Sequence, residues 1–216
     1  DMARLKAMLA AARRPLAILG GPGWTQSAAD GVRAFLERWS LPAATSFRAK
    51  DRLDNAHPLY AGDLGIGADP KLVARVAESD LLLVVGARLD EMTTGGYERI
   101  AVPLAAQGLV HVYPDPDELN RVTRADLALC SDVAAFAAAL AELSPDAPPV
   151  WTGEAQAARA AYEAFVRPVA PPGAAGITIV IGLDGHACAA AGAAASAAQP
   201  KAIARSQMSI FMFCSS

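Results

Sequence analysis

The apolar run from Leu81 to Val85, which ends abruptly at Gly86, limits the possible folds of this chain more than any other segment. A strand without alternating polar residues has to be covered on both faces, as in the centre of a parallel sheet flanked by helices. Ligands of such sheets bind outside the carboxyl ends of the strands, where a glycine permits close backbone approach. Arg88 and Asp90 follow at this position. The segment therefore predicts a crevice of the nucleotide-binding kind.

Strand-like and helix-like segments alternate along most of the chain. We expect strands at 15–19, 42–46, 81–85, 108–113 and 127–130. We expect helices at 3–13, 27–39, from Pro70, within 91–100, briefly after Asp115, at 132–143 and at 154–166, with an irregular stretch from 47 to 67. The alternation predicts an α/β fold with a doubly wound, mainly parallel sheet of about five to six strands and helices on both faces, a Rossmann-like arrangement of three layers.

Composition divides the chain into three parts. Residues 1–143 are expected to form the Rossmann-like domain, and residues 144–167 a proline-rich linker and a helix. Residues 168–216 are rich in alanine and poor in charge, and we expect a low-complexity tail that is disordered or not native. Because the first residue is Asp1 rather than Met, we expect a fragment of a longer polypeptide.

Charge, hydropathy and cysteine usage argue against several classes of protein. The net charge of -3 and the lack of a basic stripe argue against binding to nucleic acid. No apolar run is long enough for a membrane span, and the start lacks the pattern of a signal peptide. The three cysteines form no CxxC motif, which favours a reducing cytoplasm. The three histidines are scattered, so no metal site is expected.

Five segments of the chain form an ordered set of signatures. They are Arg14–Gly21, Leu41–Ser46, His57–Gly65, Asp80–Asp90 and Val110–Leu119. In this order, and over roughly residues 3–167, the chain resembles the central domain of thiamine-diphosphate-dependent enzymes of the acetolactate synthase and benzoylformate decarboxylase group. The resemblance implies a parent with three α/β domains per subunit that acts on 2-oxo acids as a homo-oligomer. The middle domain of such enzymes is mainly structural, and in some members it binds FAD or ADP.

The catalytic parts of this family are expected to be absent from the chain. The resemblance implies that one flanking domain supplies a glutamate to thiamine diphosphate, and that the other holds magnesium and the diphosphate through a Gly-Asp-Gly…Asn motif. Leu183-Asp184-Gly185 lacks the first glycine, and no asparagine follows it. We therefore expect no catalytic and no metal residues here. The fragment alone should neither bind thiamine diphosphate and magnesium nor catalyse a reaction.

The candidate cofactor-binding residues follow several of the expected strands. They are Gly20, Gly21, Gly23, Gly86, Ala87, Arg88, Asp90, Asp115 and Asp132. The resemblance implies that the segment from Gly86 to Asp90 contacts the flavin nucleotide, and that Asp115 and Asp132 contact ribose or adenine.

Each candidate also has a structural interpretation. The glycines after the first strand either expose N–H groups to a phosphate or make a tight turn. Arg88 either meets an anion or pairs with Asp90, Glu91 or the end of a helix, and Asp115 starts a turn before Pro116.

Departures from the family pattern bear on which nucleotide would bind. Ala49 and Asp51 stand where glycines are usual in the flavin-binding loop, and Arg48 replaces an apolar residue. Gly67-Ala68 replaces a histidine-glycine pair, and Glu91-Met92 replaces an aspartate-arginine pair. These changes weigh against isoalloxazine more than against adenine. Two alternatives stay open, namely a free-standing module that binds NAD or ADP, and a purely structural oligomer-interface domain.

Overall fold

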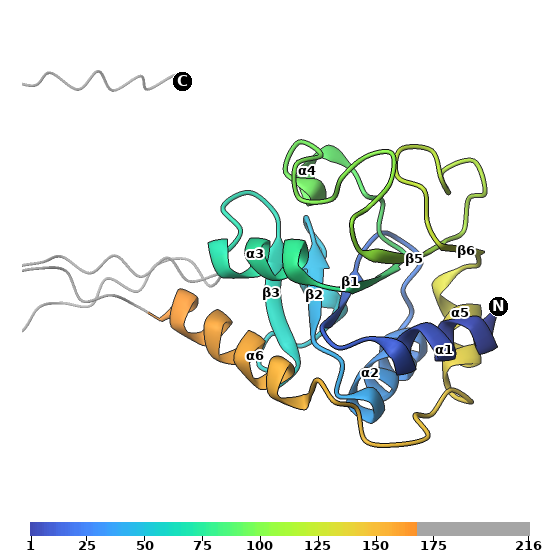
Figure 1. Ribbon diagram of the computed structural model, residues 1–216, viewed down its shortest axis with the longest axis horizontal. Helices are drawn as coiled ribbons and strands as arrows, with labels where there is room; N and C mark the ends of the chain where they lie inside the picture. The colour runs from blue at the N-terminus through green and yellow to red at the C-terminus, as the bar shows by residue number, and fades with distance from the viewer. Residues whose placement is uncertain (168–216) are drawn as a thin grey trace, which may run out of the picture. The chain divides into compact units, whose positions relative to one another are not determined.

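A computed structural model of the chain describes residues 1–167, and the predicted tail at 168–216 lies outside these residues. Six parallel strands form one open sheet in the order β3-β2-β1-β4-β5-β6 (Figure 1). The strands are β1 Pro15–Leu19, β2 Ala43–Ser46, β3 Tyr60–Leu64, β4 Leu81–Val85, β5 Gly108–Tyr113 and β6 Leu127–Cys130. This architecture confirms the predicted doubly wound α/β fold.

Helices cover both faces of the sheet (Figure 1). They are α1 Met2–Ala11, α2 Gln26–Trp39, α3 Pro70–Glu78, the short α4 Glu91–Thr94, α5 Val133–Leu140 and α6 Thr152–Val166, with a 3-10 turn, η1, at Lys50–Arg52. Buried residues of α1, α2 and α5 share one core, and those of α3 and α6 share the other. The helices therefore form the outer layers of the three-layer fold.

Strand β4 explains why its sequence contains no polar residue. Leu81, Leu83 and Val85 belong to the core beneath α2 and α5, whereas Leu82 and Val84 belong to the opposite core. The strand pairs with β1 on one side and with β5 on the other. Successive side chains of a strand point to opposite faces, so a central strand with helices on both sides must be apolar throughout.

Strand β3 lies inside the stretch that the sequence predicts to be irregular. Its residues include Gly62 and Asp63, which are disfavoured in strands, and Gly62 has a φ of +117°. It is an edge strand, and its register against β2 shifts next to Ala43. A Cβ on Gly62 would stand 3.2 Å from Leu72 and 3.4 Å from Tyr162. Packing of the neighbouring helices therefore places this strand, which local propensity does not predict.

Two helix predictions also differ from the structure. The segment after Asp115 forms turns at 116–120 and no helix. Helix α5 ends at Leu140, short of the predicted 143, and Leu143 is still buried in the core. After Asp115 a turn in which the Asp115 carboxylate accepts the N–H of Asp117 takes the place of the helix. After α5 the N–H of Leu143 donates to the Leu140 carbonyl oxygen at 3.0 Å, which closes a tighter turn than a helical one.

The segment after Ser144 packs on the same sheet. The ring of Trp151 stacks on that of Trp39 with an interplanar angle of 5°, and its Nε1 donates to the Trp39 carbonyl oxygen at 3.0 Å. Further along α6, Ala158 is buried, and Tyr162 meets Tyr60 of β3 edge to face at 4.9 Å. Helix α6 therefore contributes to the core beside β3.

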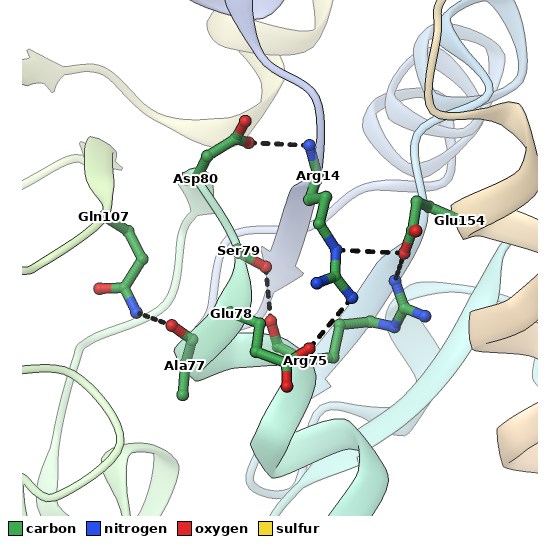
Figure 2. Close-up of polar contacts among 8 residues, drawn as sticks. All are labelled: Arg14, Arg75, Ala77, Glu78, Ser79, Asp80, Gln107 and Glu154. Atoms are coloured by element: carbon green, nitrogen blue, oxygen red, sulfur yellow. Dashed lines mark hydrogen bonds and ion pairs between the residues drawn. The ribbon is translucent and has the colours of Figure 1, made fainter.

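A polar network joins α3, α6 and the starts of β1 and β4 (Figure 2). The Asp80 carboxylate accepts the backbone N–H groups of Arg13 at 2.6 Å and Arg14 at 2.9 Å. The Arg14 side chain reaches Glu78 at 3.1 Å and Glu154 at 3.3 Å, and Glu154 also pairs with Arg75 at 3.0 Å. Because this network lies at the amino ends of the strands, opposite the predicted crevice, it serves the fold.

Replacement of Asp80 should weaken the fold measurably. Asp80→Ala removes a charged acceptor from two backbone donors, and we expect the free energy of unfolding to fall by about 1.5 kcal/mol. Urea denaturation would measure it. Glu78→Ala is the matched control, because the Glu78 side chain is 57% exposed and, among residues 1–167, pairs only with Arg14. Such a surface pair contributes less than about 1 kcal/mol. Equal losses in the two variants would contradict the role given to Asp80.

Candidate functional site

The strand order places a topological switch point between β1 and β4. From β1 the chain continues to β2 and β3 on one side, and it returns to β4 on the other side. A cavity of about 350 Å³ lies at the carboxyl ends of these strands. It is lined by Gly21, Pro22, Ser46, Phe47, Arg88, Asp90 and Tyr113. Ligands of open α/β sheets bind at this place, so the cavity is the candidate site.

Glycines allow the loops after β1, β2 and β4 to meet beside the cavity. A Cβ on Gly21 would stand 1.7 Å from the Gly86 carbonyl oxygen, and one on Gly20 would stand 1.9 Å from Ser46 Oγ. A Cβ on Gly86 would in turn stand 2.7 Å from the Gly20 carbonyl oxygen. At these three positions the structure provides a packing reason for glycine. Gly23 differs, because it has a φ of +82° with open space where a Cβ would be.

Ala87 points into the protein rather than into the cavity. Its side chain is fully buried, and its carbonyl oxygen lies 2.9 Å from Nε2 of His111 in β5. A neutral His111 with its proton on Nε2 donates this hydrogen bond. Burial lowers the pKa of His111 because desolvation disfavours the imidazolium, although the hydrogen bond to Ala87 acts in the opposite direction. The Ala87–His111 contact thus fixes the backbone just before Arg88.

The lowered pKa of His111 predicts how the stability of the folded chain depends on pH. Below about pH 6.5 the unfolded chain binds a proton at this position more readily than the folded chain does. Stability should therefore fall as the pH decreases from about 6.5 toward the folded pKa. We expect the stability difference between the wild type and His111→Gln to shrink or reverse in this range, in urea titrations at stepped pH. A difference independent of pH would contradict a lowered pKa.

Arg88 is held by residues of β5 and the loop that follows it. Its Nε donates to the Tyr113 hydroxyl at 3.2 Å and lies 3.5 Å from the Glu118 carboxylate. The Tyr113 hydroxyl, and then Glu118, raise the pKa of Arg88. Among residues 1–167 the carboxylate that pairs with Arg88 is therefore Glu118, and neither Asp90 nor Glu91, which the sequence offers as alternatives to an anion or a helix end. The guanidinium makes no other hydrogen bond among residues 1–167, and its side chain is 54% exposed at the cavity.

The three candidate aspartates each bind a nearby backbone N–H. Asp90 caps α4 through Thr93 at 2.8 Å, and Asp132 caps α5 through Ala135 at 2.7 Å. Asp115 accepts from the N–H of Asp117 at 3.0 Å, as its predicted turn requires. The cavity brings Gly21, Arg88 and Asp90 together, whereas Asp115 and Asp132 follow the neighbouring strands β5 and β6 and do not line it.

Besides Pro22, which lies between the predicted Gly21 and Gly23, three further lining residues are not among the predicted site residues. Ser46 is the last residue of β2 and Phe47 follows it, and Tyr113 is the last residue of β5. The rule that ligands lie at the carboxyl ends of parallel strands could have identified all three once those strands were predicted. Glu118 had no such signal, because its contact with Arg88 depends on how the loop after β5 folds.

Two further properties of the described residues bear on function. Within residues 1–167 no three His, Cys, Asp or Glu side chains converge to hold a metal ion. Asp184, the residue of the incomplete Gly-Asp-Gly motif, lies outside that range. Over the same residues, no helix has the length and hydropathy that a membrane span requires.

A six-stranded parallel sheet with a cavity at its switch point defines a Rossmann-like α/β domain. Residues 2–140 match the family model described as thiamine pyrophosphate enzyme, central domain. This match covers well over half of the chain, and the chain belongs to that family.

Its relatives include large subunits of acetolactate synthase. One from Parasynechococcus marenigrum is 35% identical over 133 residues, which are 62% of this chain and 21% of that protein. The isozyme 2 large subunit of Escherichia coli is 32% identical over 140 residues, which are 65% of this chain and 25% of that protein. The chain thus spans about a fifth to a quarter of the length of these relatives.

Proposed function

We propose that this chain is the central scaffold domain of a thiamine-diphosphate-dependent enzyme of the acetolactate synthase type, acting on 2-oxo acids. The match of residues 2–140 to the central-domain family is the observation on which the proposal rests. Flanking domains would supply the catalytic groups and hold magnesium and the cofactor diphosphate. We place the parent enzyme in the cytoplasm as a homo-oligomer.

The residues of this chain suit a scaffold better than a thiamine diphosphate site. In a parent enzyme, bound thiamine diphosphate would supply a carbon nucleophile and an electron sink for the decarboxylation of a 2-oxo acid. Magnesium at its diphosphate needs several oxygen ligands close together. Residues 1–167 contain no group of three or more His, Cys, Asp or Glu side chains that could hold a metal ion. The part of this domain would be to pack against its neighbours and to hold a nucleotide at the switch point.

We also propose that the cavity at the switch point binds the ADP part of a nucleotide, either ADP itself or FAD. Gly23 leaves open space beside the start of α2, where backbone N–H groups favour phosphate. Arg88 presents a half-exposed guanidinium at the cavity, and Asp90 offers a carboxylate to a ribose hydroxyl. These groups fit the ADP part.

An activity assay tests the scaffold assignment. The purified chain is mixed with thiamine diphosphate, magnesium and pyruvate, and carbon dioxide release is followed. We expect no turnover above the background without protein. Turnover that depends on the chain would contradict the assignment of the catalytic groups to other domains.

Calorimetric titration tests the nucleotide assignment. We expect ADP to bind with a stoichiometry of one, and we expect Arg88→Gln to weaken its affinity by about tenfold, the usual effect of losing one charged hydrogen bond. Binding of NAD without binding of ADP or FAD would favour a free-standing NAD module instead. Flat titrations with all three nucleotides would favour a purely structural interface domain.

A further inference from the structure

A second cavity lies beside the candidate site, at the loop after β2. Its volume is about 450 Å³, and it is lined by Phe47, Arg48, Lys50, Asp51, Asp63 and Ile66. Phe47 lines both cavities, so the two are neighbours along this residue. The N–H of Ala49 donates to the Ser46 carbonyl oxygen at 3.1 Å, which ties the loop to a residue of the first cavity. A ligand longer than the first cavity would extend into the second.

The charges around the second cavity leave one cation without a partner. Lys50 pairs with Asp63 at 2.7 Å. Asp51 pairs with Arg52 at 2.6 Å. Among residues 1–167 the Arg48 guanidinium makes no ion pair and no side-chain hydrogen bond, and it lies 5.0 Å from the centroid of the Phe47 ring. Both nearby carboxylates are thus neutralised by other residues, and the positive charge of Arg48 is available to a ligand.

The backbone of Arg48 supports a functional interpretation. Its φ is +59°, in the left-handed region of backbone conformation that residues other than glycine, asparagine and aspartate rarely adopt. Such strained positions concentrate at ligand sites, where the surrounding structure fixes them. Residues before and after Arg48 are held by backbone hydrogen bonds, from Ala49 to Ser46 and from Arg52 to Ala49. The loop therefore holds Arg48 at the cavity at some conformational cost.

At the other end of the site the positive and negative charges balance one another. Glu118 pairs with both Arg88 and Arg121, so it already offsets much of the positive charge there. Asp90 lines the same cavity without a cationic partner among the described residues. A nucleotide whose first phosphates lie beside Arg88 would thus direct any further, more anionic end toward Arg48. Nucleoside polyphosphates have this distribution of charge.

We propose that the second cavity is a subsite for the terminal phosphate of a nucleoside triphosphate, with Arg48 as its main contact. This inference rests on the proposed nucleotide site in the first cavity. It also separates triphosphates from FAD, because an oxidised isoalloxazine carries no charge that Arg48 could neutralise. The chain should therefore prefer ATP over both ADP and FAD.

Calorimetry of the full chain with AMP, ADP and ATP, in the presence of EDTA, tests the subsite. We expect ATP to bind about tenfold more tightly than ADP, since one charged hydrogen bond to the terminal phosphate is worth about that factor. Arg48→Gln should remove most of this preference and leave AMP affinity unchanged, whereas Arg48→Lys should retain part of it. Arg33→Gln, an exposed arginine on α2, is the control and should change neither affinity.

The possible outcomes separate this inference from the proposed nucleotide site. Equal affinities for AMP, ADP and ATP would overturn the subsite and leave the first cavity as a nucleotide site. A preference for ATP that survives Arg48→Gln would overturn the role of Arg48. Absence of binding for all three nucleotides would overturn both proposals.

Discussion

Gly21→Ala is expected to lower the free energy of unfolding by about 3 kcal/mol, near the top of the usual range for single substitutions. The new Cβ would stand 1.7 Å from the Gly86 carbonyl oxygen, and this neighbour is backbone rather than a flexible side chain. Gly21 also has a φ of +70°, which disfavours any residue with a Cβ. The loops after β1 and β4 would have to move apart, and the cavity between them would lose its shape. Chemical denaturation measures the decrease in the free energy of unfolding.

Gly23→Ala is the matched control for this prediction. Gly23 has a similar φ of +82°, but nothing lies within 4 Å of the position of its Cβ. Only the conformational cost of a left-handed residue remains, about 1 kcal/mol. If the two variants lose the same stability, the contact between Gly21 and Gly86 does not hold the loops together.

Trp151→Ala should cost about 3–5 kcal/mol of stability, the range for truncating a buried tryptophan. Trp151 is 2% exposed, stacks on Trp39, and donates from Nε1 to the Trp39 carbonyl oxygen. The substitution removes these contacts and leaves a cavity between α2 and the start of α6. The change in the urea midpoint measures the cost, and near-ultraviolet circular dichroism reports the loss of the stacked pair.

Val150→Ala serves as the control, because Val150 is adjacent in sequence but 78% exposed. It should change stability by less than about 0.5 kcal/mol. A small effect of Trp151→Ala would mean that the segment from Ser144 to α6 is an appendage rather than part of the core.

The central part of the fold could be predicted from the sequence because its strands are unusual. An apolar run such as Leu81 to Val85 requires cover on both faces, and this requirement does not depend on distant residues. Strand β3 could not be predicted in this way. This edge strand pairs with β2 through Tyr60, Gly62 and Asp63, and α3 and α6 pack against it. That packing depends on residues far apart in the chain, which local sequence does not reveal.

The candidate site was predictable in position but not in detail. Glycines and charged residues after β1 and β4 identify the carboxyl edge of the sheet, and the cavity lies there. The sequence does not reveal that Gly21 and Gly86 contact each other, or that Glu118 pairs with Arg88. Both contacts join separate loops, and their geometry exists only once the sheet has formed.

A crystal structure of the chain grown with ADP tests the central claim most directly. We predict electron density for the nucleotide in the cavity at the ends of β1 and β4, with its phosphates beside Gly21 and within hydrogen-bonding distance of Arg88. Nucleotide bound at a different surface, or this cavity empty in crystals grown at saturating ADP, would contradict the proposal that the central domain binds a nucleotide at its switch point.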